Sequence, residues 1–163
     1  ILNSAGIENF AEHQMDMVRL GIGVYGTSSS LNNLQPVGRL KTIITQIKDT
    51  PKGSSIGYSR SGFAEEDLTI AIIPIGYADG FGRNLGNGKG HVLVNGKLAP
   101  VIGNVCMDMT LINVTDIQCE EGDEVIIFGL ERPIEDLAKE MGTISYEVMT
   151  SISQRVVRVY LED

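Results

Sequence analysis

Apolar residues recur with a period of two along most of the chain after Pro36, and turn-forming residues separate these runs. This period places alternate side chains on one face of an extended segment, so each run predicts a β-strand. Asn95-Gly96 separates two of the runs and is a strong signal for a type I′ hairpin. Short strands at this spacing predict an all-β barrel or sandwich. The predicted strands span residues 40–47, 68–75, 91–94, 98–102, 105–114, 124–128 and 155–161.

Helical patterns are limited to two stretches of this region. Residues 134–141 follow Pro133, which suits the start of a helix, and precede Gly142, which suits its end. Residues 145–150 predict a turn or a short helix. The region from residue 36 to 163 is therefore expected to be one mainly β domain.

The first 35 residues follow a different pattern. An apolar segment ending at Ser4, a helix capped by Asn9, and an apolar segment at residues 19–26 give the order strand, helix, strand. This order is the repeat of an α/β barrel or of a doubly wound sheet, and two strands complete neither. We therefore expect residues 1–35 to be the tail of a barrel whose earlier units lie upstream, with residues 27–36 as a linker or loop. The start without an initiator methionine fits a segment of a longer protein.

Composition narrows the class of protein. The 163 residues are 42% hydrophobic and 21% charged, which is enough apolar content for one compact core. A formal net charge of -8, with both signs interspersed, argues against nucleic-acid binding and against attraction to an anionic membrane. No apolar run reaches the roughly 18 residues needed to span a bilayer. The two cysteines lack the spacing of metal ligands, which predicts no metal site and fits a reduced, cytoplasmic setting.

Polar residues beside glycines are the main candidates for chemistry. Tyr58 and Tyr77 each follow a glycine, where backbone comes close to a ligand and a phenol projects from a strand end. From the residues alone, packing is the favoured role of both tyrosines. The run Cys106 to Met109 is interpreted as a core strand with one exposed acid, Ser4 as a turn residue and Arg19 as a surface residue.

Six short blocks, in this order, resemble the fold-type III alanine racemases almost from end to end of the chain. Gly76-Tyr77-Ala78-Asp79-Gly80 and Val105-Cys106-Met107-Asp108 are the most specific of them. The other blocks are Asn3-Ser4-Ala5-Gly6, Arg19-Leu20-Gly21-Ile22 with Tyr25-Gly26, Gly57-Tyr58 and Tyr146-Glu147. The resemblance implies a protomer with an N-terminal (β/α)8 barrel that holds pyridoxal 5′-phosphate, and a C-terminal, mainly β domain.

The resemblance implies cofactor-binding roles for five residues. Ser4, Gly21, Ile22 and Tyr146 would bind the cofactor phosphate, and barrel enzymes often build a phosphate site from the loops after their last strands. Arg19 would face the pyridine nitrogen. A guanidinium keeps its proton to a pKa above about 12, so it donates a hydrogen bond without protonating the ring. The cofactor would then be a restrained electron sink.

The resemblance also implies a two-base interconversion of L-alanine and D-alanine. Tyr58 would be one base, and the cofactor-binding lysine, which no segment of this chain matches, would be the other. A free phenol has a pKa of about 10, so a neighbouring cation or hydrogen-bond donor must lower it.

The remaining blocks would face the substrate. Tyr77 would gate access to the site, the backbone of Met107 would contact the substrate carboxylate, and Asp108 would lie beside it in the substrate channel. The family forms homodimers with shared active sites, so Tyr58 would serve the partner's cofactor, and the D-alanine produced would supply peptidoglycan.

Two other functions stay open at this point. In the barrel-type pyridoxal-phosphate amino-acid decarboxylases a cysteine is catalytic, which would make Cys106 the functional residue. The Met-Asp pair after Cys106 and the intact Gly-Tyr-Ala-Asp-Gly block favour the racemase. Alternatively, the chain by itself is a non-catalytic domain that folds, dimerises or binds.

Overall fold

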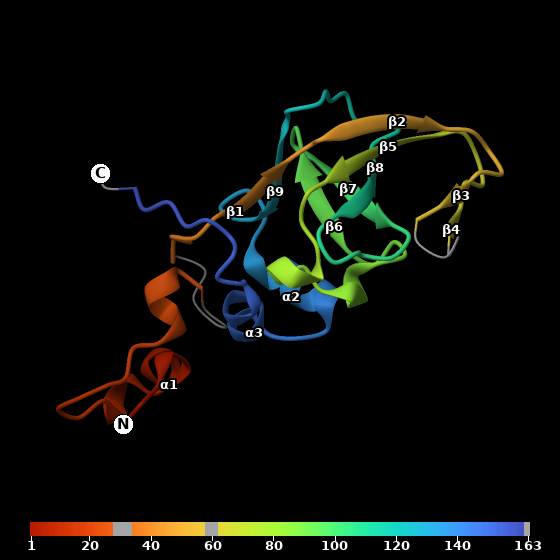
Figure 1. The fold of residues 1–163 in the computed structure, drawn as a ribbon. Helices are drawn as coiled ribbons and strands as arrows, with labels where there is room; N and C mark the ends of the chain where they lie inside the picture. Colours follow the sequence, from red (N-terminus) through yellow and green to blue (C-terminus); the bar gives the residue numbers. More distant parts are fainter. Residues whose placement is uncertain (28–33, 58–61, 162–163) are drawn as a thin grey trace.

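The computed structural model describes residues 1–27, 34–57 and 62–161, and its main feature is a curled antiparallel sheet of seven strands (Figure 1). The strands are β1 (Leu40–Ile43), β2 (Gln46–Thr50), β5 (Leu68–Ile73), β6 (His91–Val94), β7 (Lys97–Ile102), β8 (Thr110–Asn113) and β9 (Glu124–Phe128). Their order across the sheet is β1-β9-β6-β7-β8-β5-β2. A separate two-stranded ladder, β3 (Ser55–Ile56) with β4 (Gly62–Phe63), was not predicted. The predicted mainly β architecture is confirmed.

The sheet curls because its two outer strands are consecutive in the chain. The N–H of Ile44 donates to the carbonyl of Asp123 at 2.9 Å, beside β9, and the N–H of Thr45 donates to the carbonyl of Ile72 at 2.9 Å, on β5. Two consecutive residues thus form hydrogen bonds at opposite ends of the sheet. The prediction of one strand over residues 40–47 was therefore wrong: the chain changes partner at residues 44 and 45.

The core fills the inside of the curled sheet. Val92, Val94, Val101, Ile112 and Ile127 are all at most 1% exposed. On β6 the buried residues alternate with half-buried ones, as a period of two requires. The hairpin between β6 and β7 has φ of 47° at Asn95 and 77° at Gly96, both in the left-handed region that a type I′ turn needs, so this prediction is confirmed.

Two helices lie at one end of the sheet (Figure 1). Helix α2 (Ile134–Met141) begins after Pro133 and ends at Gly142, where φ is 73°, as predicted. Helix α3 (Ser145–Ser151) follows directly and buries Val148 completely. Single turns of 3₁₀ helix, η4 (Tyr77–Asp79) and η5 (Arg83–Leu85), lie between β5 and β6.

Two predicted strands are absent or shortened. Only β8 forms within residues 105–114, because the N–H of Cys106 donates to the carbonyl of Met109 at 3.0 Å and closes a turn in place of a strand. Residues 155–161 form no strand. Instead, the Arg158 guanidinium donates to the carbonyls of Ile152, Ser153 and Val156, and so holds this segment against the backbone that follows α3.

The N-terminal segment is less regular than predicted. Helix α1 (Ser4–Asn9) is capped by Asn3, whose side chain accepts from the Gly6 N–H at 2.9 Å, so Asn9 ends a helix and does not begin one. A 3₁₀ turn, η1 (Ala11–His13), follows. The expected pair of strands is a single parallel bridge between Leu2 and Val18.

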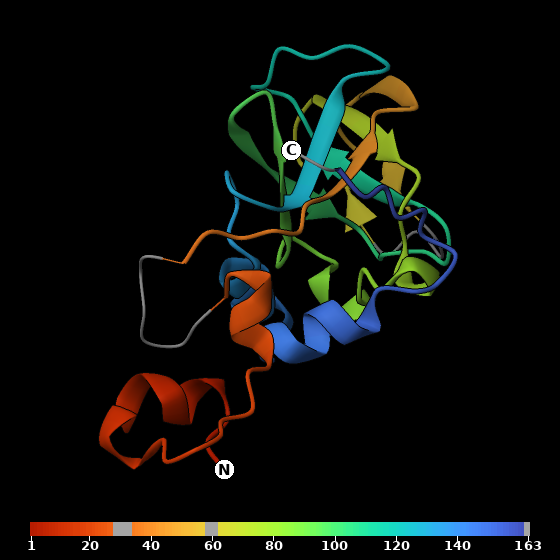
Figure 2. The same cartoon turned by 90° about the vertical axis from the view of Figure 1, so that its left-hand side faces the viewer.

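Residues 19–26, predicted as a strand, instead contain the 3₁₀ helix η2 (Ile22–Tyr25). Gly26, with φ of 71°, ends η2. η2 lies next to the helices α2 and α3, and α1 extends away from the sheet (Figure 2). Much of the predicted linker falls outside the described residues, and the domain division at residue 35 stays a prediction. None of the described helices is long and apolar enough to cross a membrane.

An ion pair between Lys41 on β1 and Glu124 on β9 predicts a dependence of stability on pH. The hydrogen bond from Lys41, and then the charge of Arg39, hold the pKa of Glu124 below its ordinary value. A carboxyl of this kind stabilises the fold above its unfolded pKa of about 4.3 and loses that contribution as the pH falls through the folded value. Because the side chain is 40% exposed, we expect Glu124→Gln to lower the free energy of unfolding at pH 7 by only about 0.5 kcal/mol.

The measurement is urea unfolding at pH 7 and at pH 3. The difference between the two proteins should shrink from pH 7 to pH 3, as Glu124 becomes protonated first in the unfolded and then in the folded protein. Glu66→Gln, at an exposed position before β5, serves as the control. A difference between Glu124→Gln and the unmodified protein that does not change with pH would contradict the prediction.

Candidate functional site

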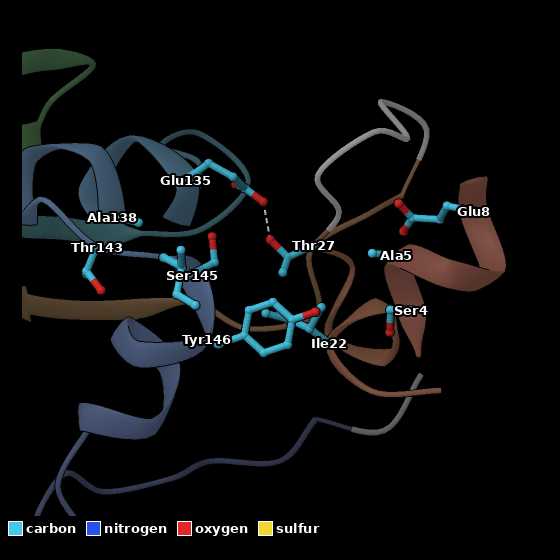
Figure 3. Close-up of a pocket in the computed structure, with 11 residues that line it drawn as sticks. Ser4, Ala5, Glu8, Ile22, Thr27, Glu135, Ala138, Thr143, Ser145 and Tyr146 are labelled. Carbon is cyan, nitrogen blue, oxygen red and sulfur yellow. Dashed lines mark hydrogen bonds between the residues drawn. The ribbon is translucent and has the colours of Figure 1, made fainter. Parts of the chain in front are cut away.

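A pocket of about 220 Å³ lies between the N-terminal segment and the helices α2 and α3 (Figure 3). Ser4 and Ile22 line it from one side and Tyr146 from the other, with the phenol directed toward Ile22 (Figure 3). The structure therefore brings together three of the four residues predicted to bind the phosphate. The other residues that line the pocket are Ala5, Glu8, Thr27, Glu135, Ala138, Thr143, Ile144 and Ser145.

The hydroxyl of Ser4 is the centre of the N-terminal wall. Ser4 is only 3% exposed, and its Oγ accepts from the backbone N–H of Gly21 at 3.0 Å and of Gly23 at 3.2 Å. A serine oxygen has two acceptor sites, and both are used here. The hydroxyl proton is therefore left to donate, and no acceptor for it is found among the described residues.

This donor set fits a phosphate group. The N–H groups of Gly21 and Gly23 are both taken up by Ser4 Oγ, and they leave its hydroxyl proton as the donor on this wall. The hydroxyls of Ser4 and Tyr146 add two side-chain donors on opposite walls. Gly21 is the fourth residue predicted for the phosphate. A Cβ there would meet only Ser4 Oγ, at 3.6 Å, so the packing of the chain itself does not require a glycine, and close approach of a ligand is a reason for one.

A contact between two distant segments closes one side of the pocket. Thr27, 4% exposed, donates a hydrogen bond from its hydroxyl to the carboxylate of Glu135 on α2 (Figure 3). This bond joins the N-terminal segment to the β domain beside Ser4. Sequence reasoning missed both residues, because neither carries a local signal and they stand 108 positions apart.

The second group of predicted residues is held by two turns that pack on each other. We call residues 76–80 the Tyr77 turn and residues 106–109 the Met107 turn. The N–H of Tyr77 donates to the carbonyl of Cys106 at 3.0 Å, and the N–H of Ala78 donates to that of Met107 at 3.1 Å. A Cβ on Gly76 would lie 2.3 Å from the Cys106 oxygen, so only glycine permits this approach.

The side chains on these turns remain accessible. Tyr77 is 41% exposed, Met107 is 52% exposed, and the side chain of Asp108 is 55% exposed. The structure brings the three predicted substrate residues together on one surface. The thiol of Cys106 is half-buried and contacts the carbonyl of Asn104 at 3.8 Å.

An arginine that sequence reasoning missed joins the two turns. Arg155 Nε donates to Asp79 Oδ1 at 2.7 Å, and its Nη2 donates to Asp108 Oδ1. The hydrogen bond to Asp108, and then that to Asp79, raise the pKa of the Arg155 guanidinium above its ordinary value. Asp79 is 8% exposed and its other oxygen accepts from the Gly76 N–H at 2.9 Å.

Two predicted residues lie apart from these groups. Arg19 is exposed and does not line the pocket, although its N–H donates to the Leu2 carbonyl at 2.7 Å, next to the bridge that places Ser4. Tyr58, the predicted base, lies outside the described residues. Gly57 before it has φ of 75°, and a Cβ there would be 3.8 Å from Gly103 Cα. The roles of Arg19 and Tyr58 stay predictions.

Comparisons with known proteins agree on one family. A family model, the alanine racemase C-terminal domain, matches residues 37–160. Alanine racemase 2 of Caldanaerobacter subterraneus subsp. tengcongensis is 43% identical to this chain, and the match covers 99% of the chain and 44% of that protein.

Solved structures give the same result. The alanine racemase of Clostridium difficile 630 is 41% identical, with a TM-score of 0.90 over 99% of this chain and 44% of that one. The alanine racemase of Bartonella henselae, solved with covalently bound pyridoxal phosphate, is 33% identical, with a TM-score of 0.92 over 98% of this chain and 46% of that one. The chain spans less than half the length of these relatives. It belongs to the alanine racemase family, and residues 37–160 match the family's C-terminal domain.

Proposed function

We propose that the longer protein containing this chain is a pyridoxal-phosphate-dependent alanine racemase. The observation that carries the proposal is the Ser4 hydroxyl, which accepts two N–H groups and so presents its proton to a pocket that Tyr146 also lines. The match to named alanine racemases over nearly the whole chain supports the same function. It does not favour the decarboxylase alternative.

The pocket residues would hold the cofactor by its phosphate. Ser4 and Tyr146 would donate from their hydroxyls and Ile22 from its backbone N–H. Gly21, whose N–H donates to Ser4 Oγ, would let the phosphate approach the backbone closely. Arg19 would donate to the ring nitrogen and keep it unprotonated. When bound, the cofactor withdraws electrons from the substrate α-carbon and so makes its proton more acidic.

Two bases on opposite faces of the α-carbon would carry out the inversion. Tyr58 would remove or return the proton on one face, and a lysine outside this chain would do so on the other. In the shared active site of a homodimer, Tyr58 would serve the partner's cofactor. Tyr77, Met107 and Asp108 would form the substrate side, with the Met107 backbone facing the substrate carboxylate. The enzyme would act in the cytoplasm. Its product, D-alanine, would supply the synthesis of peptidoglycan.

The test is an assay of the longer protein with L-alanine and with D-alanine as separate substrates. Because enantiomers have equal free energies, both reactions should reach an equimolar mixture, measured by chiral chromatography. A Cys106→Ser variant should keep this activity. Release of carbon dioxide without inversion, together with inactivity of Cys106→Ser, would instead identify a decarboxylase, and binding of cofactor without any turnover would favour the non-catalytic alternative.

The phosphate site gives a separate prediction about affinity. Ser4→Ala in the longer protein removes a donor to a charged group, which is worth about 1.5–3 kcal/mol, so we expect the dissociation constant for pyridoxal phosphate to rise roughly 10- to 100-fold. Spectroscopic titration of the cofactor-free protein measures this constant. Ser54→Ala, in the turn before β3, should leave it unchanged. Equal affinities of Ser4→Ala and the unmodified protein would exclude Ser4 from the phosphate site.

A further inference from the structure

We propose that Arg155 is a positioning residue that holds the Tyr77 turn and the Met107 turn in register, acting through Asp79 and Asp108. This inference rests on the proposed function, in which these turns face the substrate. Arg155 lies outside the blocks that carry the family resemblance, and it comes from the C-terminal segment after α3.

The geometry uses two different nitrogens of one planar group. Nε of Arg155 contacts Asp79 at 2.7 Å, and Nη2 contacts Asp108. A guanidinium holds these nitrogens at a constant spacing, so the two carboxylates are held at a constant spacing too. A lysine has one nitrogen on a flexible stem and would hold this spacing less well.

Asp79 is held in place by burial and by its own hydrogen bonds. It is 8% exposed, its Oδ2 accepts from the Gly76 N–H, and its own N–H donates to the Gly76 carbonyl at 3.0 Å. Asp108, in contrast, is largely exposed on the Met107 turn. Arg155 therefore connects a well-anchored acid to a freely accessible one, and constrains the turn that carries Met107.

The charge balance points the same way. The substrate of the proposed reaction carries a carboxylate, and two further carboxylates, those of Asp79 and Asp108, lie on the turns that would face it. Arg155 is the cation that contacts both of them in the described part of the chain. Without it, repulsion would weaken binding of an anionic group at the Met107 backbone.

The cofactor pocket does not depend on this contact. Tyr146 lies in the first turn of α3, whereas the last residue, Ser151, is the one that touches the Tyr77 turn, at Gly80. Between them, Val148 is fully buried and anchors α3 in the core. Loss of Arg155 should thus act on the substrate side and leave cofactor affinity unchanged.

The experiment compares Arg155→Met and Arg155→Lys in the longer protein, with racemisation kinetics and cofactor affinity. We expect the KM for alanine to rise about tenfold in Arg155→Met, with kcat and the cofactor dissociation constant within about twofold. The KM of Arg155→Lys should lie between that of the unmodified protein and that of Arg155→Met. The double variant Arg155→Met, Asp108→Asn should raise KM by less than the product of the two single effects, because part of the effect of Arg155 passes through Asp108.

Arg39→Gln is the matched control. Arg39 also contacts two carboxylates, Glu124 and Glu131, with its side chain 41% exposed, against 47% for Arg155. It lies beside β1, away from both turns. A change in KM no larger than that of Arg39→Gln would overturn the proposal. So would a joint loss of cofactor affinity and thermal stability, which would show that Arg155 only supports the fold, or additive effects in the double variant.

Hydrogen exchange separates this inference from the proposed function. In Arg155→Met, amides of residues 76–80 and 106–109 should exchange about tenfold faster, while those of β6 and β9 keep the rate of the unmodified protein. Absence of racemisation in the unmodified protein would defeat the proposed function, and the exchange rates would still decide the role of Arg155. Unchanged exchange in both turns would overturn it.

Discussion

Tyr58→Phe in the longer protein is expected to lower the rate of racemisation about 1,000-fold while pyridoxal phosphate remains bound. A positioned acid or base contributes about 10²- to 10⁴-fold to a proton transfer. Phenylalanine keeps the ring and removes only the hydroxyl, so shape and packing are retained. Since the free energies of the two enantiomers are equal, the loss should be the same from L-alanine and from D-alanine.

Exchange of the α-hydrogen with solvent distinguishes the two bases. If Tyr58 serves one face, then in deuterated water Tyr58→Phe should still exchange the α-hydrogen of one enantiomer, through the remaining base, and not that of the other. Mass spectrometry of the separated enantiomers measures this. Tyr160→Phe, at an 87% exposed position, is the control and should behave as the unmodified protein. Normal exchange of both enantiomers in Tyr58→Phe would show that the phenol is not a base.

Gly76→Ala is expected to lower the free energy of unfolding by about 3 kcal/mol or more, because the added methyl group meets backbone that cannot move aside. Its Cβ would lie 2.3 Å from the Cys106 oxygen and 2.4 Å from the Met107 oxygen. Relief requires the Tyr77 and Met107 turns to separate, which would break the two backbone hydrogen bonds between them. The damage would therefore extend to the substrate side of the proposed active site.

Urea unfolding of the two proteins measures this effect. Gly38→Ala is the control, because a Cβ there meets nothing within 4 Å. That variant should be as stable as the unmodified protein or slightly more so. Equal stability of Gly76→Ala and Gly38→Ala would contradict the prediction, because it would show that a Cβ fits between the two turns.

The features that could be predicted from the sequence are those set by local interactions. β6, β9 and α2 were predicted with their observed bounds, because alternation in β6, a short apolar run in β9, and a proline and a capping glycine beside α2 act within a few residues. The break at Thr45 depends on partners far along the chain, and so does the packing of the Met107 turn on the Tyr77 turn. An apolar alternating run has no local signal for such a change of partner.

The candidate site divides in the same way. Ser4, Ile22 and Tyr146 were found because they lie in blocks that resemble a family, and the structure places them around one pocket. Glu135 and Arg155 lie outside those blocks. Each meets its partner only after the chain has folded, so neither residue type nor spacing indicates its role. Charged residues in a loop or a helix are ordinarily solvated. These two differ only in their folded-state partners, Thr27 for Glu135 and two aspartates for Arg155.

The change of partner at Ile44 and Thr45, which leaves β1 at one end of the sheet, has a consequence for folding. Leu40 pairs with Phe128, so about half of the chain separates the two strands of the outermost pair. Contacts this distant in sequence slow folding, because the entropy of a long loop is lost before the contact forms. During synthesis β1 emerges long before β9, and its partner strand is missing until most of the domain has left the ribosome. A chain interrupted before Phe128 would thus expose an unpaired strand edge, the surface from which aggregation begins.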